Sequence, residues 1–334
     1  MPLHSLADMV SDAYTEAWLP GPQSTQFYTR TYLAAADTPA KATLVFIHGF
    51  AEHVGRYTEA HPEFAARGIN VFTFDERGFG KTALDEQNKS KTSSYAKTSG
   101  VHQLDDIKWA LDHAAKEFPG LPLFLAGHSM GGGEVLNFSA RRNKDAVAML
   151  SGVIACSPIV HQTHPSSKLQ RWIGGKVAIF LPYMTIPAPL NFDHLSHDAA
   201  YNEMCRTDPL AKLQGTLRGL SDMLNWGEEL LVDTYKSWPK SLPILFVHGT
   251  GDEITSHAAA EQFYQKIVSD DKNMISYAVS FAAVPSLPSN NTFCLLQGGY
   301  HELVHEPEHR EKLINDMVAF INGHLEKPAA QAKL

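Results

Sequence analysis

The segment LAGHSMGGGEVL, residues 125–136, places one serine between glycines where an apolar run gives way to a helical pattern. Gly127, Ser129 and Gly131 match the pattern G-x-S-x-G. A serine held at a sharp turn between a strand and a helix adopts strained backbone angles, and flanking glycines leave room for both elements to crowd it. The plainer alternative is a glycine-rich turn whose serine caps the helix. The position between a strand and a helix favours Ser129 as a nucleophile.

Apolar runs and helical patterns alternate along the rest of the chain. Buried strands are expected over residues 42–49, 69–75, 121–127, 151–158, 242–249 and 291–299. Helices are expected over residues 57–67, 101–118, 130–142, 256–268 and 307–325. Residues 24–35 alternate in polarity and are expected to form an edge strand in a hairpin. This order predicts an α/β protein whose mostly parallel sheet is flanked by helices.

The stretch over residues 158–240 interrupts this alternation. It carries mixed apolar and polar segments without the pattern of a buried strand. Because it is too long for a connection and too short for a second domain, we expect an inserted helical cap over one end of the sheet. The core would then comprise residues 1–157 and 241–326, and residues 327–334 a disordered tail. Residues 275–290 are apolar and end in prolines, which predicts an extra loop or a short edge hairpin.

The composition argues against several classes of protein. The 334 residues include 36 acidic and 28 basic side chains, giving a net charge of −8, which argues against a nucleic-acid partner. The sequence shows neither a signal peptide nor an apolar run of about 18 residues that could span a membrane. Cys156, Cys205 and Cys294 are few and widely spaced, as in proteins of a reducing compartment. We therefore expect a cytoplasmic protein.

A serine hydroxyl needs a general base and a third group that orients the base. In one known order of such residues, an acid and then a histidine follow the serine at the carboxyl ends of later strands. Asp252 and His301 each lie just beyond an expected strand. His305 and His309 compete with His301 but lie further on, near the last helix. The order therefore predicts Ser129, Asp252 and His301 as a catalytic triad.

Two backbone N–H groups are candidates for an oxyanion hole. The Met130 N–H directly follows the serine, and the Phe50 N–H follows the early strand that ends in FIHG. Such donors stabilise a developing oxyanion by about 3 kcal/mol each. Nucleophile, acid, base and donors thus occur in the required order at strand ends, which is a stronger signal than any single motif.

Two further motifs are weaker. His305 and His309 match the letters H-E-x-x-H of zinc proteases, which need both histidines on one helical face. Pro307 stands between them and would break such a helix, so we expect it to begin the last helix instead. RGFGKT, residues 77–82, resembles the end of a phosphate loop, but Asp75 occupies the position of the first glycine. We therefore expect neither a metal nor an organic cofactor.

Several segments together resemble the monoacylglycerol lipases of the serine α/β-hydrolase superfamily, fungal type. They are FIHGFAEHVGRY (46–57), FTFDERGFGKT (72–82), GHSMGGG (127–133), TDPL (207–210), HGTGDEIT (248–255) and GGYHELVHE (298–306). The resemblance covers residues 28–324 and implies the α/β-hydrolase fold with an inserted cap. It also implies hydrolysis of a monoacylglycerol ester to glycerol and a free fatty acid through an acyl-enzyme.

The resemblance assigns roles to single residues. It implies that Ser129 is the nucleophile, Asp252 the orienting acid and His301 the base. Phe50 and Met130 would donate their N–H groups to the oxyanion.

The same resemblance implies that Glu52, Arg56 and His128 line the polar end of the pocket, where glycerol leaves. The alternative from the residues alone is a local ion pair near the serine.

The expected cap carries an apolar stretch over residues 169–190, which includes Trp172, Ile173 and Phe180. These side chains could line an acyl tunnel and touch a lipid droplet or a membrane surface, and the alternative is that they only pack the cap onto the sheet. A fatty acyl chain gains roughly 0.8 kcal/mol for each buried CH₂ group. We expect both roles.

The sequence departs from the pattern of this family at three places. Cys205 stands where mammalian relatives have a tyrosine that faces glycerol, Thr255 stands where they have a cysteine, and residues 275–290 resemble an insertion. These departures leave open a related carboxylesterase or lysophospholipase, which would share the triad. A non-catalytic binding module of the same fold would normally lack a member of the triad.

Overall fold

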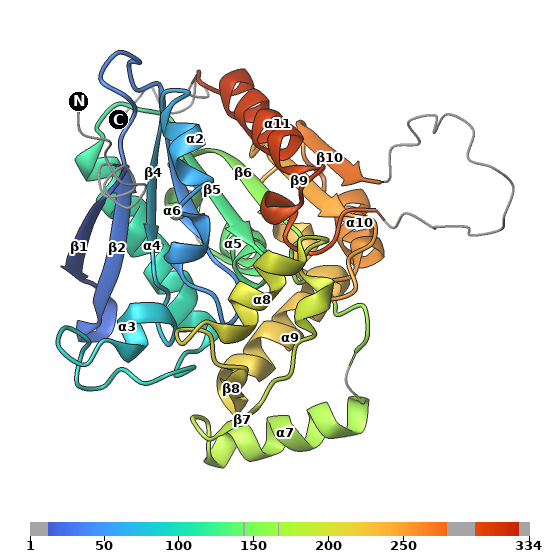
Figure 1. Cartoon of the computed structure of the whole chain (residues 1–334). Coiled ribbons are helices and arrows are strands. Elements are labelled where there is room, and N and C mark those ends of the chain that lie inside the picture. Colours follow the sequence, from blue (N-terminus) through green and yellow to red (C-terminus); the bar gives the residue numbers. More distant parts are fainter. Residues whose placement is uncertain (1–12, 143, 166, 279–297, 327–334) are drawn as a thin grey trace, which may run out of the picture.

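The computed structural model describes residues 13–142, 144–165, 167–278 and 298–326. Within these residues an eight-stranded sheet has the order β1–β2–β4–β3–β5–β6–β9–β10 (Figure 1). Its strands are β1 (Thr15–Pro20), β2 (Gln26–Tyr32), β3 (Ala42–Ile47), β4 (Ile69–Phe74), β5 (Leu123–His128), β6 (Leu150–Cys156), β9 (Ile244–Gly249) and β10 (Lys272–Tyr277). β1 and β2 pair antiparallel, and the strands from β4 to β10 in this order pair parallel. The predicted mostly parallel sheet flanked by helices is confirmed.

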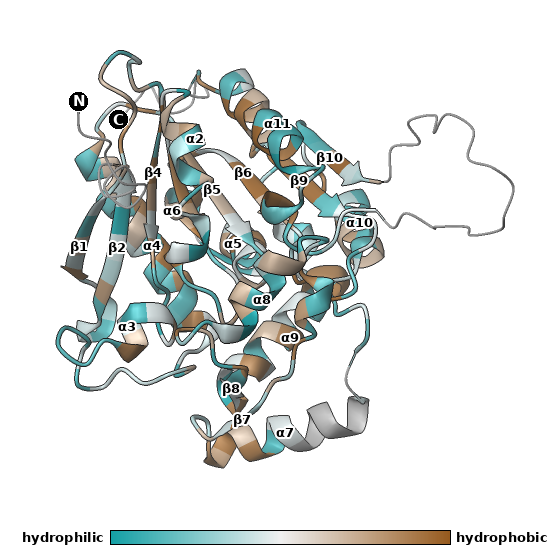
Figure 2. Cartoon of the chain, viewed as in Figure 1, coloured by the Kyte–Doolittle hydropathy of each residue, from teal (hydrophilic) through white to brown (hydrophobic). Residues whose placement is uncertain are grey.

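The central strands are largely apolar because both faces of the sheet are covered. Along β3, Leu44 packs into an apolar cluster on one face and Val45 into a cluster on the other. Along β5, Phe124 and Leu125 divide in the same way. Consecutive side chains of a strand point to opposite faces, so a strand covered on both faces has no place for polar alternation. Figure 2 shows the apolar character of β6 and β9.

The helices of the core lie on both faces of the sheet (Figure 1). α4, α5 and α10 contribute side chains to one apolar cluster, and α2 and α11 contribute to the other. Ser99 and Ser256 cap α4 and α10, because each side chain accepts a hydrogen bond from an N–H of the first turn. The core helices are α2 (His61–Ala65), α3 (Gly80–Leu84), α4 (Gly100–Glu117), α5 (Met130–Arg141), α6 (Lys144–Ala148), α10 (His257–Lys266) and α11 (Arg310–Gly323).

Two expectations about strands were wrong in part. The strand expected at residues 24–35 does pair in a hairpin, with β1, but it is not at the edge of the sheet, because β2 lies between β1 and β4. Residues 275–277, expected in a loop or hairpin, belong to β10, which extends the sheet beyond β9. β10 is a half-exposed edge strand, so it lacks the continuous apolar run that identifies central strands. Residues 279–290, and most of the strand expected at 291–299, lie outside the described residues.

Two expected helices are shorter than their patterns. The pattern over residues 57–67 divides into a 3₁₀ turn, η2 (Val54–Tyr57), and α2. The last helix begins at Arg310 rather than at Pro307, which lies in the turn that precedes it. The expectation for Pro307 was therefore wrong.

Residues 158–240 form a group of helices beside the carboxyl ends of the central strands (Figure 1). α9 packs against α5 of the core, and α7 packs against α9 on the outside. The elements are α7 (Lys168–Phe180), β7 (Thr185–Pro187), η3 (Phe192–His194), α8 (Ala199–Thr207), β8 (Gln214–Thr216), α9 (Leu217–Val232) and η4 (Thr234–Ser237). Along the described chain, none of the helices combines the length and the apolar character needed to cross a bilayer.

We expect Gly131→Ala to lower the free energy of unfolding by roughly 1–3 kcal/mol or more. A Cβ atom at Gly131 would lie 2.5 Å from the backbone oxygens of both Ile47 and His48, so a strand or a helix would have to move. Gly323→Ala is the matched control, because a Cβ atom there meets nothing within 4 Å. Urea denaturation of both variants tests this, and equal midpoints for the two variants would contradict it.

Candidate active site

Ser129 lies at the junction of β5 and α5, with φ of 55° and ψ of −113°. This positive φ is rare for a residue with a side chain and is held by the surrounding backbone. A Cβ atom at Gly127 would collide with the carbonyl oxygen of Gly131. Gly132 and Gly133 also have little space, since Cβ atoms there would lie 2.8 Å from backbone atoms of the segment that follows β6. The glycines therefore allow β5, α5 and their neighbours to meet around Ser129.

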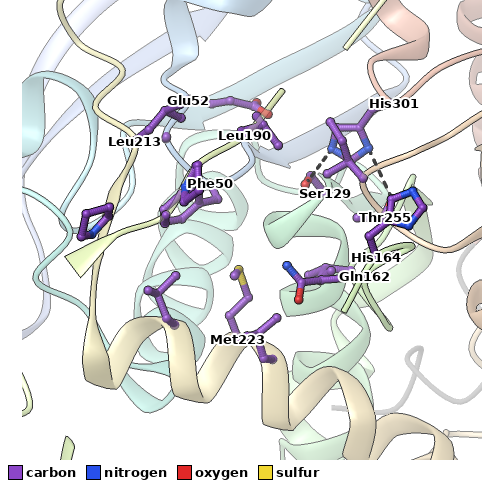
Figure 3. A pocket seen from close by; sticks show the side chains of 18 of the residues that line it. Phe50, Glu52, Ser129, Gln162, His164, Leu190, Leu213, Met223, Thr255 and His301 are labelled. Atoms are coloured by element: carbon purple, nitrogen blue, oxygen red, sulfur yellow. Dashed lines mark hydrogen bonds between the residues drawn. The ribbon is translucent and has the colours of Figure 1, made fainter. Parts of the chain in front are cut away.

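The structure brings together Ser129, Asp252 and His301, which lie far apart in the sequence (Figure 3 shows Ser129 and His301). His301 Nδ1 is 2.8 Å from Asp252 Oδ2, and His301 Nε2 is 2.9 Å from Ser129 Oγ. A carboxylate only accepts hydrogen bonds, so Nδ1 carries the proton and Nε2 accepts from the serine hydroxyl. All three side chains are buried. The arrangement can transfer the serine proton to the imidazole as the oxygen attacks.

The Asp252 carboxylate accepts hydrogen bonds on both oxygens. Oδ1 accepts from the N–H groups of Ile254 and Thr255, and Oδ2 accepts from His301, the Thr255 hydroxyl and His248. Burial alone would raise the pKa of Asp252, but the facing imidazoles of His301 and His248 outweigh burial and hold this pKa well below its usual range. The carboxylate is therefore ionised and fixed in orientation.

The other two histidines considered for the base lie elsewhere. His305 belongs to η5 (Leu303–His305) and stacks on the ring of Tyr201. His309 immediately precedes α11, next to Tyr277. His305 and His309 thus lie in a 3₁₀ turn and a cap rather than on one helical face. Among the described residues, no group of three or more His, Cys, Asp or Glu side chains is arranged to hold a metal ion.

The two residues expected to supply oxyanion donors lie close to Ser129. Met130 opens α5, and the first N–H groups of a helix have no acceptor within the helix. Phe50 lies in the loop after β3 and lines the cavity described below. This loop lies directly against the nucleophile, since a Cβ atom at Gly49 would be 3.0 Å from Ser129 Cβ.

A cavity of about 680 Å³ opens on Ser129 and His301 (Figure 3). Its walls come largely from residues 158–240 and are mostly apolar. They include Ile186, Leu190, Leu213, Leu217, Leu220, Met223 and Leu224. Gln162, Ser221 and Asn225 add polar groups to the wall. A cavity of this size and character suits a long apolar ligand.

The opposite end of the cavity is polar and charged. Of the residues expected there, Glu52 and Arg56 belong to the described lining, whereas His128 does not and lies behind Glu52. His128 Nδ1 is 3.1 Å from Glu52 Oε1, and His128 Nε2 is 3.2 Å from the backbone oxygen of His301. Glu302 also lines the cavity, and its Oε1 is 3.2 Å from Arg56 Nη1. Glu52 and Arg56 thus line the cavity, and Glu52 also forms a local ion pair with His128, which was the alternative considered.

Sequence reasoning missed Glu302, Tyr201 and His248. The Tyr201 hydroxyl donates a hydrogen bond to Glu302, and Tyr201 lies one helical turn before Cys205 on α8. A tyrosine thus bonds to a residue of the cavity lining, although Cys205 occupies the position where mammalian relatives have theirs. Glu302 follows a histidine in the sequence, and this carries no signal of its own. His248 could have been identified, because His248 and Gly249 repeat the pair His48 and Gly49 that follows β3.

The Glu52–His128 pair makes folding depend on pH. Burial alone would lower the pKa of His128, but the charge and hydrogen bond of Glu52 raise it to about 9. In the unfolded chain a histidine has a pKa of about 6.5. The pair therefore contributes stability that is fully present below pH 6.5 and is lost as the pH rises through about 9.

We expect the free energy of unfolding of Glu52→Gln to depend less on pH between 6.5 and 9 than that of the unchanged protein. The difference over this range should be on the order of 3 kcal/mol, the value of a shift from 6.5 to about 9. Urea denaturation at several pH values measures it. Glu203→Gln, which removes an exposed ion pair with Arg206, is the control and should leave the slope unchanged. Equal slopes in all three proteins would contradict the assignment.

Known proteins match this chain in sequence and in fold. The family model described as Serine aminopeptidase, S33 (Hydrolase_4) matches residues 38–281. A putative monoglyceride lipase of Schizosaccharomyces pombe is 34% identical over 258 residues, which span 75% of this chain and 64% of that protein. The monoglyceride lipase of Saccharomyces cerevisiae is 28% identical over 263 residues, 76% of this chain and 81% of that protein.

Solved structures agree with the sequence comparisons. A soluble variant of the Saccharomyces cerevisiae monoglyceride lipase, solved with a substrate analog, superimposes with a TM-score of 0.76 at 24% identity, over 94% of this chain and 95% of that one. The expected resemblance to monoacylglycerol lipases and the expected α/β-hydrolase fold are confirmed. Because the family model matches most of this chain, the chain belongs to the Hydrolase_4 family of serine hydrolases.

Proposed function

We propose that this protein hydrolyses the ester of monoacylglycerols to glycerol and a free fatty acid. The observation that carries the proposal is the hydrogen-bonded series Ser129–His301–Asp252 at a cavity with an apolar wall and a polar end. The names of the relatives in both yeasts support the substrate class.

In the proposed reaction, Ser129 Oγ attacks the ester carbonyl carbon and its proton passes to His301 Nε2. Asp252 stabilises the imidazolium that forms. The N–H groups of Phe50 and Met130 bind the oxyanion and contribute roughly 3 kcal/mol each. His301 then protonates the departing glycerol oxygen, which leaves an acyl-enzyme on Ser129. Water, deprotonated by His301, releases the fatty acid and restores the serine.

The two ends of the cavity suit the two parts of such a substrate. We assign residues 158–240 as a cap on a core of residues 1–157 and 241–326, and the cap supplies the apolar wall for the acyl chain. Each buried CH₂ group contributes roughly 0.8 kcal/mol to binding. At the polar end, Glu52 and Arg56 offer groups that bond to the glycerol hydroxyls, while His128 holds Glu52 in place.

We expect Ser129→Ala to remove hydrolysis of monoolein almost completely, because the alanine has no nucleophilic oxygen. The fold should persist, as the alanine needs no more space than the serine, and circular dichroism checks this. A fluorophosphonate probe should label the unchanged protein at Ser129 and leave the variant unlabelled. Hydrolysis retained by the folded variant would contradict the proposal, and an unlabelled native protein would favour a non-catalytic binding module.

A related carboxylesterase or lysophospholipase would use the same residues. Turnover of monoolein, lysophosphatidylcholine and a short nitrophenyl ester by the unchanged protein separates these activities. Our proposal requires the highest kcat/KM for monoolein.

We also propose that the cap contacts a lipid surface, such as a lipid droplet or a membrane. Ile179 and Phe180 at the end of α7 are 68% and 83% exposed, and this end of the helix is apolar (Figure 2). Apolar side chains this exposed on an outer helix commonly mark a contact surface. The side chains of Trp172 and Ile173, expected in the same surface, lie outside the described part of the chain.

We expect the double variant Ile179→Gln, Phe180→Gln to bind liposomes about thirtyfold more weakly, since each side chain loses on the order of 1 kcal/mol of apolar burial. Its activity on a soluble nitrophenyl ester should stay unchanged. Val268→Gln is the control, because Val268 is 67% exposed but lies outside the cap. Co-sedimentation with liposomes measures binding, and equal binding by all three proteins would contradict the proposed contact.

A further inference from the structure

His248 lies at the end of β9, four residues before Asp252, and its side chain is fully buried. Its Nε2 atom is 3.1 Å from Asp252 Oδ2 and 3.1 Å from the backbone oxygen of Thr255. A carboxylate and a carbonyl only accept hydrogen bonds, so Nε2 must carry a proton and donate it. His248 Nδ1, by contrast, has no hydrogen-bond partner among the described residues. The two acceptors of the Nε2 proton, Asp252 Oδ2 and the Thr255 backbone oxygen, therefore orient the ring.

His248 and His301 donate to the same carboxylate oxygen. Oδ2 of Asp252 is 2.8 Å from His301 Nδ1 and 3.1 Å from His248 Nε2. Most other donors to Asp252 come from the turn that contains it, over residues 252–255. His248 instead belongs to a central strand whose backbone is paired on both sides, to β6 and to β10. It therefore ties the carboxylate to the rigid part of the sheet.

A hydrogen bond to a carboxylate has two consequences for the base that shares it. It favours the ionised carboxylate, which the imidazolium formed during the reaction needs as its partner. It also withdraws part of the negative charge that Oδ2 directs at His301, which lowers the affinity of that imidazole for a proton. The cavity lining, over the described residues, does not include His248, so any effect on the reaction passes through its two partners, Asp252 and the backbone of Thr255.

We propose that His248 is a positioning residue for the reaction: through its Nε2–H it holds the Asp252 carboxylate in orientation and sets the proton affinity of His301. This inference rests on the proposed function of the site. It requires that a donor at the position of Nε2, rather than the bulk of the side chain, supports the reaction.

The other titratable groups around His248 and His301 come from β5, from the loop after β3 and from α10. His128 at the end of β5 faces His301, with ring centroids 4.7 Å apart, and is itself paired with Glu52. His257 on α10 faces His248, with centroids 5.3 Å apart, and Glu261 lies on the same helix. Burial and the neighbouring His248 hold the pKa of His257 below its ordinary value, so His257 is neutral at the pH of an esterase assay.

The test compares substitutions at position 248 that differ in one donor. His248→Leu and His248→Asn place no donor where Nε2 stood, because leucine has none and the asparagine amide reaches only the position of Nδ1. The amide nitrogen of His248→Gln can reach the position of Nε2. His257→Gln is a control for a change beside His248 that leaves Asp252 untouched. Using two variants without the donor keeps the test valid if one of them fails to fold.

We expect His248→Leu and His248→Asn to lower kcat for p-nitrophenyl butyrate about tenfold with little change in KM, in line with the loss of one hydrogen bond to a charged group. The acid limb of their kcat/KM profile should move to higher pH, since His301 then faces a carboxylate with one donor fewer. His248→Gln should restore most of kcat and the original profile, and His257→Gln should match the unchanged protein.

Two results would overturn the inference. One is a pH profile and kcat of folded His248→Leu and His248→Asn equal to those of the unchanged protein. The other is a loss in His248→Gln as large as in His248→Leu, because the bulk or the shape of the ring would then matter and not its donor. Failure of the proposed function is distinguishable, since the unchanged protein would then not hydrolyse monoolein, whereas the inference about His248 is tested by comparing the variants on p-nitrophenyl butyrate.

Discussion

The left-handed backbone of Ser129 is the constraint on which the site depends. This conformation is possible because three segments approach one another closely, and glycines stand at the points where a side chain would prevent the contact. Gly131 faces the carbonyl oxygens at the end of β3, Gly127 faces Gly131, and Gly49 faces the Ser129 side chain. The same close approach that strains the serine also brings the loop after β3 beside it. The turn thus sets the position of the serine oxygen and of the candidate oxyanion donors together.

Two buried histidines organise the loops that complete the site. His48 directly follows β3 and His248 lies near the end of β9, and each is followed by glycine. His48 Nδ1 donates to the oxygen of Gly49, which leaves Nε2 to accept from the N–H of Glu76. The ring therefore bridges the loops that follow β3 and β4, as His248 bridges β9 and the turn of Asp252. Burial lowers the pKa of His48, and a neutral imidazole suits this place because it can donate at one nitrogen and accept at the other.

Much of the fold could be predicted from the sequence because strands covered on both faces must be largely apolar. β3, β4, β5, β6 and β9 follow this rule, and the motif residues could be located at their ends. The rule does not reach half-exposed edges, which is why β1 was not expected and the start of β10 was assigned to a loop. The rule also does not predict contacts between side chains that are far apart in the sequence. Glu302 bonds to Tyr201 and Arg56, which lie about 100 and 250 residues away. No spacing in the sequence predicts these contacts.

The buried charges at the polar end of the cavity are paired, and this pairing affects which leaving group the site can accept. Arg56 bonds to Glu302, and His128 to Glu52. Buried ions of this kind are stable only when paired, because an unpaired charge in a protein interior loses its hydration without compensation. Each pair nevertheless keeps acceptor and donor capacity that a hydroxyl group can use. An uncharged, hydroxyl-rich leaving group would exchange its hydrogen bonds with water for bonds to these pairs without disturbing their balance, whereas a phosphate would compete with Glu302 for Arg56. The chemistry of glycerol fits this balance, which links the buried ion pairs to the proposed substrate.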